Sequence, residues 1–472
     1  MGVDVAKPLR LKRGVDRLFP VDQSAKPRRK ISTNALLGMG LWVLLWSGYN
    51  TEIGRVMQPN FPANATELIH GVRAFFPMLA GWAACLMIAA RSNRLFPWIM
   101  GPLGLMLLYA ATGLVSSATL SINPTDALYY GANYLAIILV LLEIVLVEDP
   151  LPDLLKVLRL TWIVGTILTL ALLGAIPILG SQAIVETEAS PVGMRAYNGA
   201  GTILGMASTR NTGFARYAAI SALVALPGLM RNGKRVVRII WGILFAASLY
   251  ALVVANGRTE TLAFFASAIV ILAAERAKRM VNLLVGTAAA ILLGLRGFYS
   301  ELFRYLTRTG HIDLTMTGRT VYWQQGWRLL WKSPWVGFGF QADRYYLAGA
   351  HMHNAFLHVL IQSGFLGGGA ILIGLAIVWY FLIQDFFLRQ PTDKSLIPPE
   401  IPAVFLFMTI SSVAESTFAY YSAAWLLSAP IVAYAIALHR KIQRALAAAA
   451  RERGKTMRFG RRRPRELDSA AT

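Results

Sequence analysis

The side chains best suited to chemistry lie between residues 317 and 375. This region reads TGRTVYWQQGWRLLWKSPWVGFGFQ and then AHMHNAFLHVLIQSGFLGGGAILIGL, and it contains Arg319, His351, His353, Asn354 and His358. An imidazole with a pKa near about 6.5 can take up a proton at neutral pH. A guanidinium binds phosphate or carboxylate oxygens through two parallel hydrogen bonds. The region therefore indicates proton transfer beside a bound anion.

Composition places these residues in a membrane protein. Of 472 residues, 56% are hydrophobic and 15% are charged, whereas an average soluble chain has about 25% charged residues. Twelve apolar runs approach the length of about 20 residues that crosses the hydrocarbon core of a bilayer. Their approximate limits are 33–49, 71–90, 97–119, 126–147, 158–179, 214–230, 236–255, 259–275, 280–297, 364–385, 401–417 and 421–438. We expect an all-α, polytopic membrane protein of about twelve transmembrane helices.

The distribution of positive charge predicts how these spans are oriented. If the N-terminus is inside, the inner segments hold 33 of the 46 Lys and Arg residues. Positive residues concentrate in cytoplasmic loops, so both termini are expected in the cytoplasm and the spans in the inner membrane. The inner segments are 1–32, 91–96, 148–157 with Arg159 just beyond, 231–238, 276–279, 386–400 and 439–472. The first apolar run lacks a small-residue cleavage site and is expected to remain as an anchor.

The net charge of +22 is compatible with nucleic acid or with anionic lipid. Most of the charge adjoins membrane segments, so we expect membrane lipid as the partner and no nucleic acid. The single cysteine, Cys85, allows no intrachain disulfide.

Arginine dominates the outer segments, where it supplies twelve of the 13 basic residues. Arginine is favoured over lysine where a planar fork binds anionic oxygens, although a compositional bias or contact with lipid headgroups would give the same pattern. One long outer loop, 298–363, carries Trp323, Trp327, Trp331 and Trp335 at intervals of four residues. This spacing predicts an amphipathic helix lying on the headgroups, and stacking on sugar rings is the alternative.

The order of these features resembles the O-antigen ligase and O-antigen polymerase family of bacterial membrane glycosyltransferases. An arginine opens a tryptophan-rich stretch, a Ser-Pro-Trp-x-Gly-x-Gly turn closes it, and a His-Asn pair leads into a glycine-rich span. The Asn256–Thr259 loop and the Ser208–Gly213 stretch resemble two further segments of that family, although the family more often has Ser before the arginine at 258. The resemblance covers roughly residues 200–420.

The resemblance implies transfer of a glycan from undecaprenyl diphosphate to a hydroxyl acceptor at the periplasmic face. Such a reaction needs a base for the acceptor proton and cations for the charge growing on the diphosphate. His353 matches the family's His-Asn position and is expected to be the base. Direct attack on the anomeric carbon would invert its configuration.

Further residues are expected to support the reaction. Arg258 and Arg319 are the best diphosphate ligands, and Arg210 and Arg216 are weaker ones. Asn354 and His351 belong to the His-Asn motif. Glu415, at the outer end of the eleventh span, is expected to orient a histidine or to hold an arginine, and a plain ion pair without a role in the reaction is the alternative.

No metal and no cofactor are expected. The outer acidic residues contain no Asp-x-Asp pair for a divalent ion, and the nearest pattern is Glu186-Thr187-Glu188. Arginine would replace the metal as the counter-charge.

These expectations divide the chain into five parts. They are a basic cytoplasmic tail (1–32), transmembrane helices one to nine (33–297), a periplasmic catalytic loop with amphipathic helices (298–363), transmembrane helices ten to twelve (364–438) and a second basic cytoplasmic tail (439–472).

The acceptor stays open at this stage. A ligase would give the glycan to lipid A core, which the His-x-His-Asn form slightly favours. An O-antigen or exopolysaccharide polymerase would give it to another lipid-linked glycan. A flippase for the same lipid is the alternative from another class, but a transporter should carry ionisable residues at the midplane of its spans.

Overall fold

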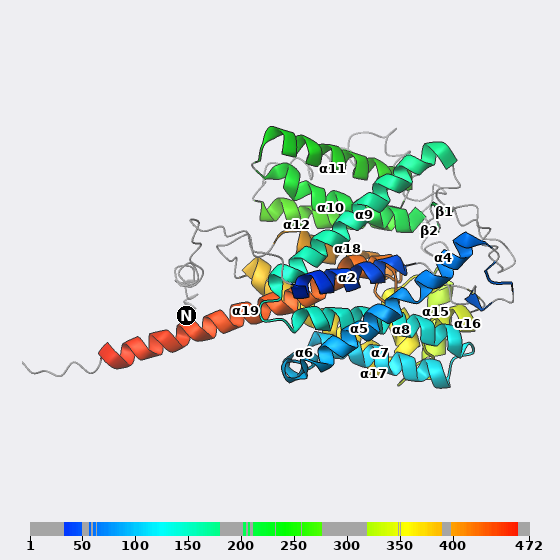
Figure 1. The fold of residues 1–472 in the computed structure, drawn as a ribbon, viewed down its shortest axis with the longest axis horizontal. Coiled ribbons are helices and arrows are strands. Elements are labelled where there is room, and N and C mark those ends of the chain that lie inside the picture. Colours follow the sequence, from blue (N-terminus) through cyan, green and yellow to red (C-terminus); the bar gives the residue numbers. More distant parts are fainter. Residues whose placement is uncertain are drawn as a thin grey trace, which may run out of the picture.

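The described part of the chain is helical, apart from one pairing of two very short strands (Figure 1). The computed structural model describes residues 33–49, 56–57, 60–62, 64–179, 202–203, 206–207, 211–231, 233–255, 257–275, 319–347, 349, 351–388 and 398–460. Strands β1 (Thr202–Ile203) and β2 (Met206–Ala207) pair antiparallel. The predicted all-α class is confirmed.

The helices follow the apolar runs of the sequence. They are α2 (Thr33–Ser47), α4 (Ala65–Ala74), α5 (Phe76–Ala89), η1 (Ser92–Arg94), α6 (Phe96–Ile99), α7 (Pro102–Thr119), α8 (Pro124–Val145), α9 (Leu151–Leu179), α10 (Asn211–Met230), α11 (Arg235–Ala255), α12 (Arg258–Ala274), α15 (Arg319–Leu330), α16 (Ala342–Tyr346), α17 (Ala355–Leu382), η4 (Ile383–Leu388), α18 (Glu400–Ala414) and α19 (Ala423–Gly460). Eleven of the twelve predicted spans overlap these helices, and the ninth, 280–297, lies outside the described residues.

Eight helical segments of the described chain are long and apolar enough to cross a membrane, so the protein is a polytopic membrane protein. They are Glu67–Ala89, Pro102–Thr119, Pro124–Val145, Leu151–Ala175, Thr212–Met230, Arg235–Ala255, Ala355–Phe386 and Ala423–Arg451. Helices α2 and α18 are apolar but shorter. The count of twelve spans therefore stays a prediction.

Burial separates the central helices from the peripheral ones. The apolar part of α19 is 89% buried and that of α8 is 72% buried, whereas α11 is only 17% buried. Since α11 is nonetheless strongly apolar, its exposed face is suited to lipid rather than to water. Helices α8 and α19 thus form the centre of the bundle, and α11 forms part of its rim (Figure 1).

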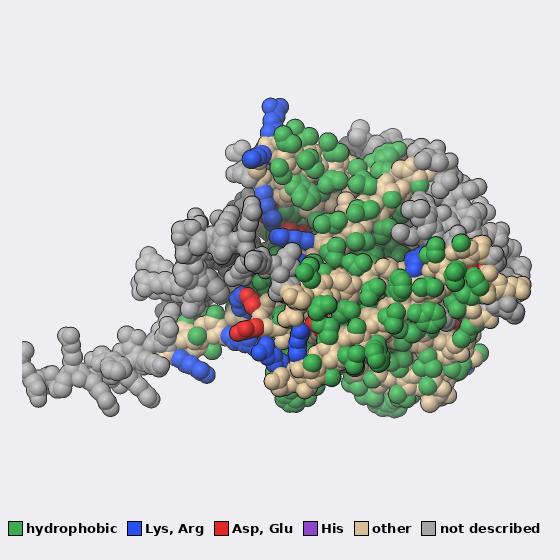
Figure 2. Space-filling model, viewed as in Figure 1, with side chains coloured by type: hydrophobic (Ala, Val, Ile, Leu, Met, Phe, Trp, Pro, Cys, Tyr) green, Lys and Arg blue, Asp and Glu red, His purple; other side chains and the backbone are tan. Residues whose placement is uncertain are grey.

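Charged contacts gather at two opposite ends of the bundle. At one end Arg91 donates to Glu143 and Asn34, and Lys441 pairs with Asp149. Helix α19 projects from this end, and α15 and α16 lie at the other (Figure 1). On the face shown in Figure 2, hydrophobic side chains cover the body and most Lys and Arg side chains lie towards the end with α19.

No ion pair among the described residues joins a segment predicted to be inside with one predicted to be outside. The end that bears α15 and α16 is called the outer end below.

A kink in α17 receives the turn that follows α15. Gly364 breaks α17 with φ 61° and ψ −167°, which frees backbone groups on both sides of it. The turn provides hydrogen-bond partners for these groups. The Phe338 N–H and Gly339 N–H donate to the carbonyls of Ile361 and Gln362, at 2.9 and 2.8 Å. In return, the Phe365 and Leu366 N–H groups donate to the carbonyls of Pro334 and Trp335. Backbone groups within a membrane bundle need such partners, so the turn and the kink stabilise each other.

The kink explains a difference from the expected span. Helix α17 begins at Ala355, nine residues before the predicted start at 364, because Asn354 caps a short helical segment that precedes Gly364. Gly364 itself serves the kink, whereas Gly367 serves close packing, since a Cβ there would overlap Thr112.

Candidate active site

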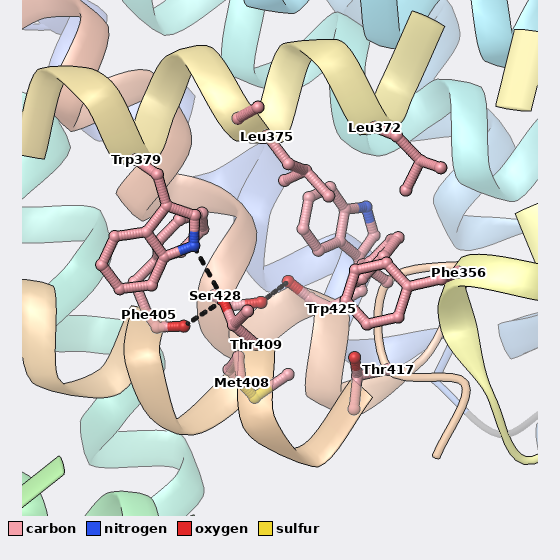
Figure 3. A pocket seen from close by; sticks show the side chains of 12 residues that line it. Phe356, Leu372, Leu375, Trp379, Phe405, Met408, Thr409, Thr417, Trp425 and Ser428 are labelled. Atoms are coloured by element: carbon pink, nitrogen blue, oxygen red, sulfur yellow. Dashed lines mark hydrogen bonds between the residues drawn. The ribbon is translucent and has the colours of Figure 1, made fainter. Parts of the chain in front are cut away.

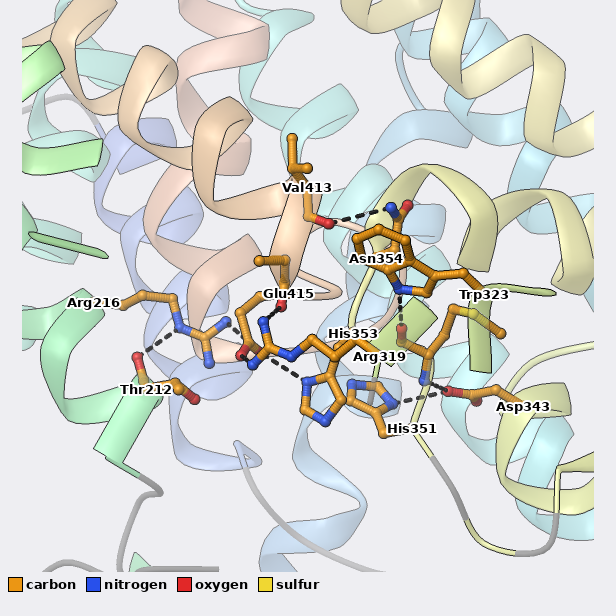
Figure 4. A network of polar contacts seen from close by, with 12 residues as sticks. Thr212, Arg216, Arg319, Trp323, Asp343, His351, His353, Asn354, Val413 and Glu415 are labelled. Carbon is orange, nitrogen blue, oxygen red and sulfur yellow. Dashed lines mark hydrogen bonds and ion pairs between the residues drawn. The ribbon is translucent and has the colours of Figure 1, made fainter. Parts of the chain in front are cut away.

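Four predicted residues meet at the outer end in one polar cluster, which we call the Glu415 cluster: Glu415, His353, Arg319 and Arg216 (Figure 4). They come from four separate parts of the chain. Arg319 opens α15, Arg216 lies on α10, Glu415 follows α18, and His353 lies just before α17. The fold thus assembles residues that are up to 199 positions apart in the sequence.

Glu415 lies at the centre of this cluster. Its Oε1 accepts a hydrogen bond from Arg319 Nη2 at 3.2 Å, and its Oε2 lies 3.3 Å from His353 Nδ1. Arg216 Nη1 lies 4.0 Å from Oε2, which is an ion pair without a close hydrogen bond. Glu415 therefore contacts one histidine and two arginines.

The cations around Glu415 keep its carboxyl group ionised. Burial favours the neutral acid, since only 4% of the residue is exposed. The hydrogen bond with His353 and the charges of Arg216, His353 and Arg319 outweigh burial and lower the pKa of Glu415 to about 2. The cluster therefore holds a permanent anion at neutral pH.

Backbone anchors hold both arginines of the cluster. Arg319 Nη1 donates to the Ala414 carbonyl at 2.7 Å, and Arg216 Nε donates to the Thr212 carbonyl at 3.1 Å. The guanidinium groups are thus pre-positioned side by side, and each keeps further N–H groups for an anion.

The segment that carries His353 is held on both sides. The Trp323 indole donates to the Met352 carbonyl at 2.9 Å, and the Asn354 amide donates to the Val413 carbonyl at 3.1 Å. The Asn354 side-chain oxygen also caps α17 by accepting the Leu357 N–H. His353 adopts φ 48°, a left-handed conformation that is uncommon for a non-glycine residue. Such strain persists only where the surroundings enforce it, and it is common at functional sites.

A second polar cluster, formed by Asp343, His351 and His358, lies directly behind the first. The His351 and His353 rings are 4.7 Å apart. Asp343 Oδ2 lies 2.8 Å from His351 Nδ1, and Asp343 Oδ1 lies 3.1 Å from His358 Nε2. His351 was predicted as a supporting residue, but Asp343 was not.

The protonation states of Asp343 and His351 differ from those in water. Burial opposes ionisation of Asp343, yet His358 and the hydrogen bond from His351 hold the pKa of Asp343 well below its usual range. Burial, with a contribution from Arg344, lowers the pKa of His351 to about 3 despite the adjacent carboxylate. Asp343 is therefore an anion, and His351 is neutral at pH 7 and donates Nδ1–H to it.

The ligand atoms of Asp343, His351 and His358 lie within 4.8 Å of one another, so this cluster has the donor types of a metal site. This grouping was not predicted, because the expectation of no metal rested on the absence of a carboxylate pair in the sequence. Contacts of 2.8 and 3.1 Å between the groups are ordinary hydrogen bonds. Within this cluster, the buried Nδ1 of His358 nevertheless has no hydrogen-bond partner among the described residues.

The remaining predicted residues are less directly placed. Arg258 is half-buried at the start of α12, and Arg210 lies outside the described residues. Two residues after Arg258, the buried carboxylate of Glu260 lies within electrostatic range of Glu415, Arg216 and Arg319. Glu260 was not predicted, although its position in the first turn of the helix that Arg258 opens was a usable signal.

An apolar pocket of about 240 Å³ lies between α17, α18 and α19 (Figure 3). At one end it is lined by Phe356 and Thr417, each two residues from a member of the polar site, and at the other end by Trp379 and Phe405. The Trp379 indole donates to the Thr409 hydroxyl at 3.0 Å, whereas the buried indole N–H of Trp425, which also lines the pocket, has no hydrogen-bond partner among the described residues. The pocket therefore runs from the site into the membrane-spanning part of the bundle.

The tryptophans of the outer loop divide into two roles. Trp323 is partly buried and donates a hydrogen bond to the Met352 carbonyl. Trp327, Trp331 and Trp335 are exposed. The Trp327 ring packs edge-to-face on Trp331, and the Trp331 and Trp335 rings both pack edge-to-face on Phe365 of α17. This exposed aromatic row is suited to the membrane interface.

Comparison with known proteins agrees with the resemblance seen in the sequence. Residues 243–372 match the family model described as O-Antigen ligase. The exopolysaccharide production protein ExoQ of Rhizobium meliloti (strain 1021) is 35% identical over 91 residues, which covers 16% of this chain and 19% of that relative. The predicted resemblance to the O-antigen ligase and polymerase family is confirmed. The family match includes Arg258, Arg319 and His353.

Proposed function

Because residues 243–372 carry the sequence pattern of the O-antigen ligase family, we propose that this chain is a membrane glycosyltransferase. It moves a glycan from a polyprenyl diphosphate, undecaprenyl diphosphate in bacteria, to a hydroxyl acceptor at the outer end of the bundle. The observation that carries the proposal is the His353–Glu415 contact beside Arg216 and Arg319.

Glu415 prepares His353 to act as a base. If the ionised carboxylate accepts Nδ1–H, the lone pair of His353 is on Nε2, and this nitrogen takes the proton of the acceptor hydroxyl. A carboxylate that fixes the tautomer of a catalytic histidine also stabilises the imidazolium that forms.

The reaction is a single displacement. The acceptor oxygen forms a bond to the anomeric carbon while the bond from that carbon to the diphosphate oxygen breaks. The electron pair goes to the diphosphate, the proton goes to His353, and the configuration at the anomeric carbon inverts. Arg319 and Arg216, with Arg258 and Arg210 from the neighbouring segments, stabilise the negative charge on the leaving group. Arginine supplies the counter-charge, and the reaction needs no metal.

The apolar pocket supports a lipid-linked donor. A prenyl chain has no polar groups, and the wall formed by Phe356, Leu372, Leu375 and Phe405 offers it apolar contacts (Figure 3). Since this pocket begins beside the polar site, one molecule could place its diphosphate in the site and its chain in the pocket.

The acceptor distinguishes two forms of the proposal. A ligase gives the glycan to lipid A core, as the description of the family model favours. A polymerase gives it to a second lipid-linked glycan, which the named relative in exopolysaccharide production favours. Both forms use the same base and the same arginines.

The test is transfer by the purified protein in liposomes. The protein receives a glycan on undecaprenyl diphosphate together with either lipid A core or a second lipid-linked glycan, and the products are separated by mass. Transfer to lipid A core indicates a ligase, and chain extension indicates a polymerase. Absence of both products, with a donor that is shown to bind, would contradict the proposed function.

A further inference from the structure

We propose that Asp343 is a positioning residue, which fixes the backbone of residues 351–352 and so presents His353 to the acceptor. This inference rests on the proposed function, but Asp343 does not contact His353. Asp343 acts through the backbone of residues 351–352, which leads to His353.

The Asp343 carboxylate is fully buried and makes four contacts. Its Oδ2 accepts the Met352 N–H at 2.9 Å and contacts His351 Nδ1 at 2.8 Å. Its Oδ1 accepts the Arg344 N–H at 3.0 Å and lies 3.1 Å from His358 Nε2. Two successive residues of the His353 segment are thus bound to one oxygen.

Burial makes these contacts obligatory. A buried carboxylate that loses its partners is strongly destabilised, so a displacement of residues 351 and 352 would leave the charge unpaired. The third partner, His358, lies on α17, which carries the kink described above. Asp343 therefore ties the segment to the membrane helix that follows it.

The conformation of His353 requires such a restraint. A residue with φ 48° would relax to a common backbone conformation unless its neighbours prevented this. Asp343 holds the N–H of Met352, and Trp323 holds its carbonyl. With residue 352 fixed on both sides, the His353 ring is directed towards Glu415 (Figure 4).

A matched control exists at the opposite end of the bundle. Asp385 is also buried and lies 2.8 Å from a histidine, His439, with the same Oδ2 and Nδ1 atoms. D385N therefore removes a carboxylate–histidine pair of the same kind, far from His353.

The first readout does not depend on activity. Hydrogen exchange of the peptide that contains residues 351–354 is measured by mass spectrometry in the full-length wild type, D343N, D343A and D385N. The proposal predicts faster exchange of the Met352 amide in D343A, a smaller increase in D343N, and no change in D385N. Unchanged exchange in D343A would overturn the restraint, whether or not the protein transfers glycans.

The second readout is transfer. D343A is expected to lose about tenfold to a hundredfold in kcat with little change in KM for the donor. The reason is that a small displacement of the His353 ring moves it out of hydrogen-bonding geometry with the acceptor hydroxyl. In the H353A background, D343A should cause no further loss, since Asp343 acts through His353. An equal loss in both backgrounds would assign Asp343 a general structural role. An inactive wild type would refute the proposed function alone, because the exchange experiment would still decide the restraint.

Discussion

At the scale of single residues, the site depends on one buried anion surrounded by groups that can bear positive charge. Glu415 contacts Arg319, His353 and Arg216 and keeps a pKa of about 2. An incoming diphosphate would compete with this carboxylate for the arginines. The geometry of each guanidinium is therefore as important as its charge.

Arg319→Lys tests that geometry. Lysine keeps the charge but cannot reach the Ala414 carbonyl and Glu415 with a planar fork. We expect transfer to fall about tenfold or more, which corresponds to the loss of one charge-assisted hydrogen bond of about 1.5–3 kcal/mol. Arg328→Lys, on the exposed face of the same helix, serves as the control. Equal rates for Arg319→Lys and wild type would reduce Arg319 to a general electrostatic role.

Metal removal tests the Asp343 cluster. Because Asp343 already has hydrogen bonds with His351 and the Met352 N–H, and arginine supplies the counter-charge in the proposed reaction, we expect transfer to survive a strong chelator. Rates before and after EDTA are compared, with magnesium, manganese or zinc added back. Loss of transfer that one of these ions restores would make the cluster a metal site.

The sequence identified the motif residues of the site and Glu415, but it did not identify Asp343. His353, Asn354 and Arg319 lie in a recognisable order within 36 positions of one another. Asp343 lies in the same region without any motif, and only the fold shows that it faces His351, His358 and the Met352 amide. Such contacts depend on the backbone path of the loop, and a loop leaves no periodic pattern in the sequence from which that path could be predicted.

At the scale of elements, the turn after α15 and the kink of α17 form one unit. Four backbone hydrogen bonds join them, and the unit adjoins both α7 and the His353 segment. The apolar pattern predicted the span from residue 364, but it could not show the preceding helical turns or the break. Hydrophobicity carries no information about backbone dihedral angles. From the sequence, the glycines of this span therefore predict only close helix packing and not a kink.

Gly364→Ala tests the kink. Residue 364 has a positive φ, and a Cβ there would overlap the backbone of Trp335 and Val336. We expect a loss of about 1–3 kcal/mol in the free energy of unfolding, with reduced transfer, because the His353 segment leads directly into the same helix.

Gly369→Ala is the matched control, since a Cβ at this position meets nothing within 4 Å. Stability is followed by thermal unfolding in detergent. Similar melting temperatures for Gly364→Ala and Gly369→Ala would mean that the kink is not required.

At the scale of the whole molecule, the separation of charge defines two ends. Ion pairs of the predicted inner loops, such as Arg91–Glu143 and Lys441–Asp149, lie away from the Glu415 cluster. This separation was predictable because hydrocarbon imposes it on every span. The same constraint makes the spans the most predictable part of the fold.

We expect the outer end to face the periplasm and both tails to lie in the cytoplasm. Reporter fusions at residues 310 and 460 measure this directly, with an enzyme that is active only outside the cytoplasm and one that is active only inside. A periplasmic signal at 310 and a cytoplasmic signal at 460 are expected. A cytoplasmic signal at 310 would place the site where the proposed reaction does not occur.

The central claim is that His353 is the general base, and the pH dependence of transfer by wild type and H353A tests it most directly. General base catalysis contributes about 10²–10⁴-fold, so H353A should lose about that factor while binding of the donor persists. A base must be neutral to act, so wild-type transfer should fall as the pH drops through the range in which a histidine is protonated. H353A should lack this fall. A wild-type rate that instead rises towards acid pH, with donor binding unimpaired, would contradict the claim.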